Sequence, residues 1–162
     1  MNKTKRKIFE TSMKLFAEKG YDATSIEEIT ATVGVAKGTL YYHFSSKEEI
    51  FEFLVEEGVK LLKNSISIKT DNLKNSIDKI RAIVLIQIKV LFKYESFMTI
   101  ILSQIWGNDE RSQLCKKHVF EYIQMIEEIV KEGQEKGEIV DADSNVLASG
   151  IFGFISSSFI YK

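Results

Sequence analysis

The sequence contains no proline, a single cysteine and only two histidines among its 162 residues. Because proline is the residue that most strongly breaks helices, its absence favours a fold built entirely from α-helices. A single cysteine, Cys115, excludes an internal disulfide and fits a reducing compartment, so we expect a cytoplasmic protein. The histidines lie far apart in the sequence and form no ligand cluster with the cysteine. We therefore expect no metal site.

The chain also lacks an excess of charge of either sign, since its formal net charge is −1. This value excludes a nucleic-acid binder that is basic over its whole surface. Positive charge is instead local. The first seven residues contain Lys3, Lys5, Arg6 and Lys7 and no acid, and residues 37–47 contain two lysines and no acid. Any affinity for nucleic acid must therefore come from a local basic patch.

Long hydrophobic runs are missing as well. The charged amino-terminal residues are not followed by an apolar segment, so we expect no secretory signal there. Residues 146–161 carry no charge, which makes a membrane anchor the alternative for this segment. The segment is shorter than the roughly 20 residues that a spanning helix needs. Its many serines are also poor lipid contacts, and we therefore expect no membrane segment.

Residues 24–44 have the pattern of two short helices joined by a turn. Residues 24–33 are helical in character and end at Gly34, and residues 35–44 start a second short helix. Two short helices joined by a glycine-containing turn are typical of a helix-turn-helix. The second helix is rich in hydrogen-bond donors and contains no acid, which suits a surface that faces phosphates and base edges.

The preceding residues complete a small three-helix domain. Apolar residues at helical spacing predict a first helix from about Thr4 to Lys19, which Gly20 ends. Ser25, or Thr24, is expected to cap the second helix, and a glutamate three residues later completes a capping box. The residues expected to be buried in this domain are Ile8, Phe16, Ile26, Ile29, Val35, Leu40 and Phe44.

The segment from Gly34 to Phe44, followed by Lys47-Glu48-Glu49, resembles the DNA-binding signature of the TetR family of bacterial repressors. Residues 16–26 resemble the end of the family's first helix and the start of its second. The resemblance extends over roughly residues 5–54. It implies that a set of residues in and beside the third helix contacts DNA. These are Thr24, Ser25, Lys37, Gly38, Thr39, Tyr41, Tyr42, His43 and Lys47.

Some of these residues also have simpler explanations. The ring of Tyr41 could pack within the domain, and His43 alone would more often be a structural histidine. Gly38 has no reason of helix propensity to lie inside a helix, so a close approach to the DNA backbone explains it better. Lys47 combines an ammonium group with the N-terminus of the next helix, which is a good phosphate site.

The remaining sequence predicts further helices. A capping box at residues 46–49 opens a fourth helix, which we expect to act as a rigid connector to about Asn64, and residues 69–72 are predicted to be a loop. Apolar residues at helical spacing predict a fifth helix from Leu73 to Leu91. Between Ala82 and Phe92 only Gln87 and Lys89 are polar, so this helix is expected at the buried centre of a bundle. Further helices are predicted at residues 97–106 and 111–136, and another from Asp143 or Ser144 onwards.

The expected fold is all-α, with an N-terminal three-helix helix-turn-helix DNA-binding domain at residues 1–46. A connector helix joins it to an α-helical ligand-binding and dimerisation bundle at residues 47–162. TetR-like chains usually carry one further helix at their end. The sequence stops at Tyr161-Lys162, so this bundle is expected to lack that final helix and with it part of the dimer surface.

The family resemblance implies an effector pocket among the fifth to eighth helices, although ordinary bundle core is the simpler explanation for each candidate residue. An apolar pocket would favour a hydrophobic or aromatic small molecule. Its candidate lining residues are Tyr94, Phe97, Met98, Trp106, His118, Phe120 and Tyr122. Small residues in the last helix suit close contact between two copies. The candidate dimer residues there are Gly150, Gly153, Phe154 and Ser157.

We therefore expect a homodimeric transcriptional regulator of palindromic double-stranded DNA, most simply a repressor that a small-molecule effector releases. Alternatively, a protein with the same helix-turn-helix could be an activator or adaptor that recruits a protein partner. A helical enzyme with a cofactor among Trp106, Cys115 and His118 is a third reading. The sequence contains neither a phosphate loop nor a nucleophile elbow, so we expect no catalytic residues and no cofactor.

Overall fold

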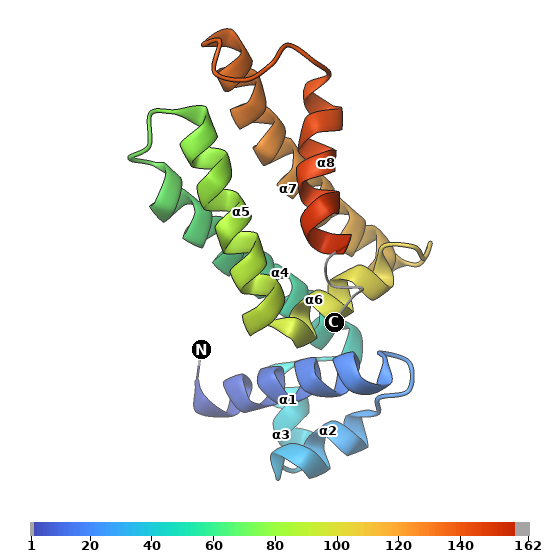
Figure 1. The fold of residues 1–162 in the computed structure, drawn as a ribbon. Coiled ribbons are helices and arrows are strands. Elements are labelled where there is room, and N and C mark those ends of the chain that lie inside the picture. Colours follow the sequence, from blue (N-terminus) through green and yellow to red (C-terminus); the bar gives the residue numbers. More distant parts are fainter. Residues whose placement is uncertain (1, 158–162) are drawn as a thin grey trace. The chain divides into compact units, whose positions relative to one another are not determined.

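The computed structural model describes residues 2–157, and these residues form eight α-helices and no strand (Figure 1). The all-α prediction is confirmed. The helices are α1 (Lys3–Lys19), α2 (Ile26–Val33), α3 (Lys37–His43), α4 (Lys47–Thr70), α5 (Ser76–Lys93), α6 (Glu95–Gln104), α7 (Glu110–Glu135) and α8 (Ser144–Ser157). The uncharged segment that begins at Val146 continues past Ser157, and its last residues lie outside the described part of the chain. The predicted lack of a helix after α8 also concerns that part.

The helices form two compact units, and neither unit is continuous in the sequence. Unit 1 comprises Met1–Gly58 and Glu95–Cys115, and unit 2 comprises Val59–Tyr94 and Lys116–Lys162. Helices α4 and α7 therefore contribute residues to both units. The predicted boundary after residue 46 divides the chain by function and not by contacts, and it stays a prediction.

Local capping explains where the helices of the helix-turn-helix begin and end. The Ser25 side chain accepts a hydrogen bond from the Glu28 backbone N–H (3.1 Å), whereas the Thr24 hydroxyl donates to the Gly20 carbonyl (2.9 Å). Ser25 is therefore the cap of α2. Gly34 closes α2 with φ of 79°, a left-handed conformation that glycine adopts without a Cβ clash. The chain can turn there into α3.

The core of unit 1 is rich in aromatic rings. Phe44 and Phe51 are buried, and Phe51 packs against Phe16 and Tyr21 with ring centroids 6.2 and 5.4 Å apart. Helix α1 packs along α6 in the same unit. Of the residues predicted to be buried, all but two are; the exceptions are Ile26 and Val35, which are only half-buried.

Helix α4 is longer than predicted. Its start agrees with the prediction, since the Ser46 hydroxyl accepts a hydrogen bond from the Glu49 N–H (3.1 Å). Its end does not, because the helix continues past Asn64 to Thr70. Ile66 is buried in the core of unit 2, and the Thr70 hydroxyl donates to the Ile66 carbonyl (2.9 Å). The burial of Ile66 anchors the last turns of α4 in unit 2.

Helix α5 is not the central helix that its composition predicts. It packs beside α8 with a single face, on which Ile83, Gln87 and Leu91 are buried. On another face Leu85 is 61% exposed and Phe92 is 62% exposed. The prediction was wrong because one polar residue, Gln87, lies on the buried side while apolar residues lie on the exposed side. Composition alone does not reveal which face is covered.

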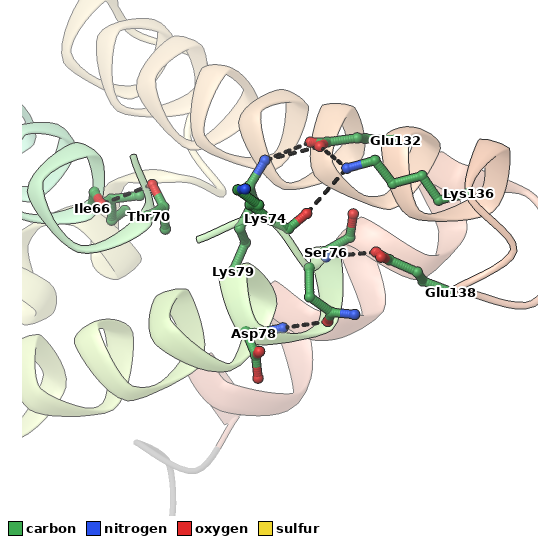
Figure 2. A network of polar contacts seen from close by, with 10 residues as sticks. Ile66, Thr70, Lys74, Ser76, Asp78, Lys79, Glu132, Lys136 and Glu138 are labelled. Atoms are coloured by element: carbon green, nitrogen blue, oxygen red, sulfur yellow. Dashed lines mark hydrogen bonds and ion pairs between the residues drawn. The ribbon is translucent and has the colours of Figure 1, made fainter. Parts of the chain in front are cut away.

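The core of unit 2 is mostly aliphatic. It consists of Ile66, Ile83, Tyr122, Ile126, Val130 and Ala148. A polar network joins the start of α5 to the end of α7 (Figure 2). The Glu132 carboxylate accepts hydrogen bonds from Lys79 (2.7 Å) and Lys136 (2.5 Å), which lower the pKa of Glu132 to about 2. The Glu138 carboxylate accepts a hydrogen bond from the Ser76 N–H (2.7 Å), at the N-terminus of α5.

Candidate nucleic-acid interface

Helix α3 separates its apolar residues from its polar ones. Leu40 is fully buried, and Phe44, directly after the helix, is 1% exposed. On the outer side Tyr42 is 84% exposed and Tyr41 is 45% exposed. Residues four apart lie on the same helix face, so Leu40 and Phe44 hold the helix while both tyrosines keep surface exposed to solvent. The exposed face of α3 combines hydroxyl groups with an absence of acidic side chains, which suits contact with DNA.

Lys37, at the start of α3, forms an ion pair with Glu27 of α2, with Nζ and Oε1 2.5 Å apart. The side chains are 52% and 67% exposed, so the pair lies on the surface. The hydrogen bond raises the pKa of Lys37 and lowers the pKa of Glu27. An exposed pair contributes little to stability. The ammonium group can therefore exchange this carboxylate for a phosphate at small cost.

The other predicted residues of α3 differ in their surroundings. A Cβ added to Gly38 would meet no atom within 4 Å, so nothing inside the protein requires glycine at this position. Thr39 and His43 are half-buried. The His43 ring lies against Tyr42, with centroids 5.0 Å apart. Internal packing therefore explains in part why threonine and histidine occupy positions 39 and 43. It does not explain why position 38 is a glycine.

Lys47 makes internal contacts rather than pointing to solvent. Its Nζ donates hydrogen bonds to the backbone carbonyls of Tyr21 and Thr24, both at 2.9 Å. The same nitrogen lies 4.2 Å from the centroid of the Tyr21 ring. Three predicted DNA-binding residues, Thr24, Ser25 and Lys47, therefore meet at the turn before α2. Their contact with phosphate stays a prediction.

The basic residues in the first turn of α1 are only partly available for contact with nucleic acid. Lys5 Nζ lies 4.3 Å from the centroid of the Phe53 ring and 4.7 Å from that of Phe44. Arg6 pairs with Glu10 at 2.8 Å, and both side chains are more than half exposed. Lys3 is exposed. The local positive charge that the sequence indicates is therefore available mainly at exposed side chains of α1 and α3.

Similarity to known proteins identifies the family of this chain. Residues 8–54 match the family described as bacterial regulatory proteins, tetR family, and residues 73–160 match the tetracyclin repressor-like C-terminal domain. The chain belongs to the TetR family. It is thus a transcriptional regulator with a helix-turn-helix DNA-binding domain.

This TetR-family chain has informative relatives. It is 40% identical over 74 residues to IcaR of Staphylococcus aureus, the negative transcriptional regulator of the biofilm operon icaADBC. That match covers 46% of this chain and 40% of IcaR, so the chain spans less than half of the curated relative's length. A Clostridium perfringens structure, assigned as a candidate regulator of fatty acid metabolism, is 35% identical. It has a TM-score of 0.89 over 96% of this chain and 84% of that one.

A third relative supports the fold alone. AibR, solved with isovaleryl coenzyme A and operator DNA, has a TM-score of 0.85 and is 22% identical, over 99% of this chain and 88% of AibR. At this identity the likeness shows only that both chains fold in the same way.

The residues that the TetR resemblance indicated for an effector pocket belong to different units. Phe97 and Met98 are buried in unit 1, where Trp106 is 86% exposed. Tyr94 and Phe120, in unit 2, are 47% and 55% exposed. The pocket itself stays a prediction.

Tyr122 is the candidate with the most specific surroundings. It is buried in unit 2, and its hydroxyl donates a hydrogen bond to Gln87 Oε1 (3.0 Å). The Gln87 amide in turn donates to the Phe152 carbonyl and the Ser156 hydroxyl, both at 3.3 Å. Gln87 was not predicted as a site residue. It stands out in the sequence only as one of two polar residues between Ala82 and Phe92.

His118 and Cys115, the two residues of the alternative enzyme hypothesis that could act chemically, have different surroundings. His118 Nδ1 lies 3.3 Å from Glu121, which also accepts a hydrogen bond from Lys63 (2.7 Å). Burial raises the pKa of the Cys115 thiol to about 12, which keeps it protonated. Among residues 2–157, no group of three metal-binding side chains occurs. Within the same residues, no helix is long and apolar enough to cross a membrane.

The candidate dimer residues lie on one exposed face of α8. Phe154 is 83% exposed, and Gly150, Gly153 and Ser157 are exposed beside it. A Cβ added at either glycine would meet no atom within 4 Å. The face carries no charge, while the opposite side of the helix is buried. Two such faces could approach closely, although dimer contact through them stays a prediction.

Proposed function

We propose that this chain is a dimeric repressor that binds a palindromic operator through α3 and is released by a small-molecule effector. The observation that carries this proposal is the exposed, acid-free face of α3, which Leu40 and Phe44 anchor from beneath. Two copies would place their α3 helices in successive major grooves, about 34 Å apart.

The DNA contacts follow from the surroundings of each residue. Tyr41 and Tyr42 reach outwards from α3, and Lys37 exchanges its pairing with Glu27 for a phosphate. The bare backbone at Gly38 lets the helix approach the DNA strand closely. Thr39 and His43 add phosphate contacts at the edges of α3. At the N-termini of α2 and α4, the backbone N–H groups near Thr24, Ser25 and Lys47 supply further phosphate contacts.

Dimer formation is proposed through the small-residue face of α8. Gly150, Gly153 and Ser157 allow a partner helix to come close, and Phe154 supplies apolar surface for burial. Substituting Gly153 by glutamate would place a charge on this face. We expect that variant to be monomeric by sedimentation, whereas the Gly153→Ala variant stays dimeric.

The proposed effector is a hydrophobic small molecule that binds within residues 47–162, which we propose as the effector-binding and dimerisation domain. Its binding site is proposed among Tyr94, Phe97, Met98, Trp106, His118, Phe120 and Tyr122. One structural relative, the candidate regulator of fatty acid metabolism from Clostridium perfringens, supports an acyl compound. Release from DNA requires that the effector bind the free protein more tightly than the DNA-bound protein.

A second candidate function is an activator or adaptor that recruits another protein. It is favoured by the exposed apolar residues Leu85, Ile88 and Phe92 of α5, because surface apolar clusters often mark protein contacts. Protection of α5 from hydrogen exchange in the operator-bound dimer, without any other protein, would remove this support.

The test is an enrichment of random DNA duplexes by the purified protein at near-physiological salt, followed by titration of the selected duplex. We expect the selected duplexes to contain an inverted repeat.

The Tyr42→Ala variant should bind this inverted repeat at least about tenfold more weakly than the wild type. The Lys37→Ala variant should reduce the slope of log K against log salt by about 1. The Tyr94→Ala variant, which also removes an exposed tyrosine, should bind normally. Unchanged binding by the Tyr42→Ala and Lys37→Ala variants would contradict the proposed interface.

A further inference from the structure

Tyr21, in the turn between α1 and α2, is surrounded by charged side chains from two distant parts of the sequence. It is 5% exposed, and its ring is contacted by Lys47 Nζ at 4.2 Å and by Arg111 Cζ at 4.0 Å. Its hydroxyl donates a hydrogen bond to Glu48 Oε1 (2.8 Å). Burial, with a further contribution from Glu48, raises the pKa of Tyr21 well above its usual value. The ring is therefore a neutral, buried surface for two cations.

Arg111 reaches this turn from the first turn of α7. Its guanidinium lies 2.7 Å from Asp109 and 3.4 Å from Asp22. The side chain is 23% exposed, and its Nε is buried without a hydrogen-bond partner in the described part of the chain. Leaving a buried donor unpaired is costly, and the contacts of the guanidinium with Tyr21 and the two aspartates offset that cost.

The turn that these contacts hold determines where α2 begins. Lys47 Nζ bonds the carbonyls of Tyr21 and Thr24, which are the first and last residues of the turn. Ser25, the next residue, is the N-cap of α2. Movement of Tyr21 would therefore displace the cap and with it α2, which leads through Gly34 into α3.

We propose that Arg111 is a positioning residue for operator recognition, which holds the turn before α2 through Tyr21 and Asp22 without touching DNA. This inference rests on the proposed function of α3 in operator binding. It goes beyond that function because it makes DNA affinity depend on a residue of α7, whose contacts lie on the turn and not on α3.

The salt dependence of operator binding separates this role from a direct phosphate contact. Arg111→Ala should weaken binding about tenfold at every salt concentration, with the slope of log K against log salt unchanged. A phosphate contact would instead lower the slope by about 1. Arg111→Lys keeps the charge but loses the planar group that stacks on the ring, so it should fall between Arg111→Ala and the wild type. Arg81→Ala, which removes an exposed arginine paired with Asp78, should bind as the wild type does.

Hydrogen exchange in the absence of DNA tests the same proposal independently. Amides of residues 26–33 should exchange faster in Arg111→Ala than in the wild type, while amides of residues 76–93 remain unchanged. If the wild type selects no duplex, the proposed function fails, and exchange still decides whether Arg111 holds the turn. Three results for the Arg111→Ala variant would each overturn the proposal. These are exchange in α2 at the wild-type rate, faster exchange throughout the protein, and a reduced slope of log K against log salt.

Discussion

The two units of the molecule have cores of different kinds. In unit 1, aromatic rings contact one another. The ring centroids of Phe16 and Tyr21 are 5.2 Å apart, and those of Phe44 and Phe53 are 5.4 Å apart. In unit 2 the core is isoleucine, valine and alanine around a single tyrosine. Aromatic pairs prefer particular angles, whereas aliphatic side chains can be rearranged as long as their total volume is kept. We expect unit 1 to be the more rigid of the two.

This difference fits the tasks proposed for the two parts of the chain. A helix that must fit a DNA groove needs a fixed position, which directional ring contacts provide. A site that accepts a small molecule gains from a core that can adapt. Three changes would break or sharpen the comparison.

The largest effect is expected from removing a ring of unit 1. Phe51→Ala should lower the free energy of unfolding by about 3–5 kcal/mol, since it deletes a fully buried side chain and its contacts with Phe16 and Tyr21. Urea denaturation measures the loss. Ile126→Ala, the matched change in unit 2, should also destabilise the protein but should leave the operator affinity of the folded fraction intact. Equal losses of operator affinity in the two variants would remove the distinction.

A smaller effect is expected from the polar pair in the core of unit 2. Tyr122→Phe removes the hydroxyl that donates to Gln87 and leaves a buried carbonyl oxygen without this donor. The expected loss is about 1–3 kcal/mol in the free energy of unfolding. Tyr94→Phe, at a half-exposed position, is the control and should have almost no effect. A Tyr122→Phe variant as stable as the wild type would show that this pair does not stabilise unit 2.

The smallest effect concerns the network at the start of α5. Because Lys136 and Lys79 lower the pKa of Glu132 from 4.5 to about 2, the folded protein holds this carboxylate in its charged form more strongly than the unfolded chain does. Its contribution to stability is therefore complete above about pH 5 and disappears as the pH falls towards 2.

Comparing Glu132→Gln with the wild type isolates this contribution from those of other carboxylates. The variant should be slightly less stable above pH 5, and the two denaturation midpoints should converge as the pH approaches 2. Because the Glu132 side chain is 36% exposed, added salt should reduce the difference. A difference that stays constant over this pH range would exclude the pairing as its cause.

Sequence reasoning succeeded where the physical cause is local. Ser25, Gly34 and Ser46 act at helix ends within a few residues, so their spacing predicted the boundaries of α2 and the start of α4. The burial of Leu40 followed from helical periodicity in the same way. The identity of the DNA-binding motif also needs only a short stretch of sequence.

It failed where the cause lies far away in the chain. The end of α4 depends on the burial of Ile66 in unit 2, and the exposed face of α5 depends on which helices cover it. The contact of Arg111 with Tyr21 joins residues that no local pattern relates. Gln87 was visible as a polar residue in an apolar run, but its bond to Tyr122 was not. The effector candidates had only composition to support them.

The packing of α1 on α6 has a consequence for chimeric proteins. Unit 1 needs residues 95–115 in addition to its first 58 residues, since α6 covers α1 and Arg111 holds the turn before α2. A fragment cut after Gly58 would expose apolar surface of α1. Recombination that exchanges only the leading segment between related regulators would therefore pair α1 with a foreign α6. Grafts that also transfer residues 95–115 should be the ones that fold and keep their operator preference.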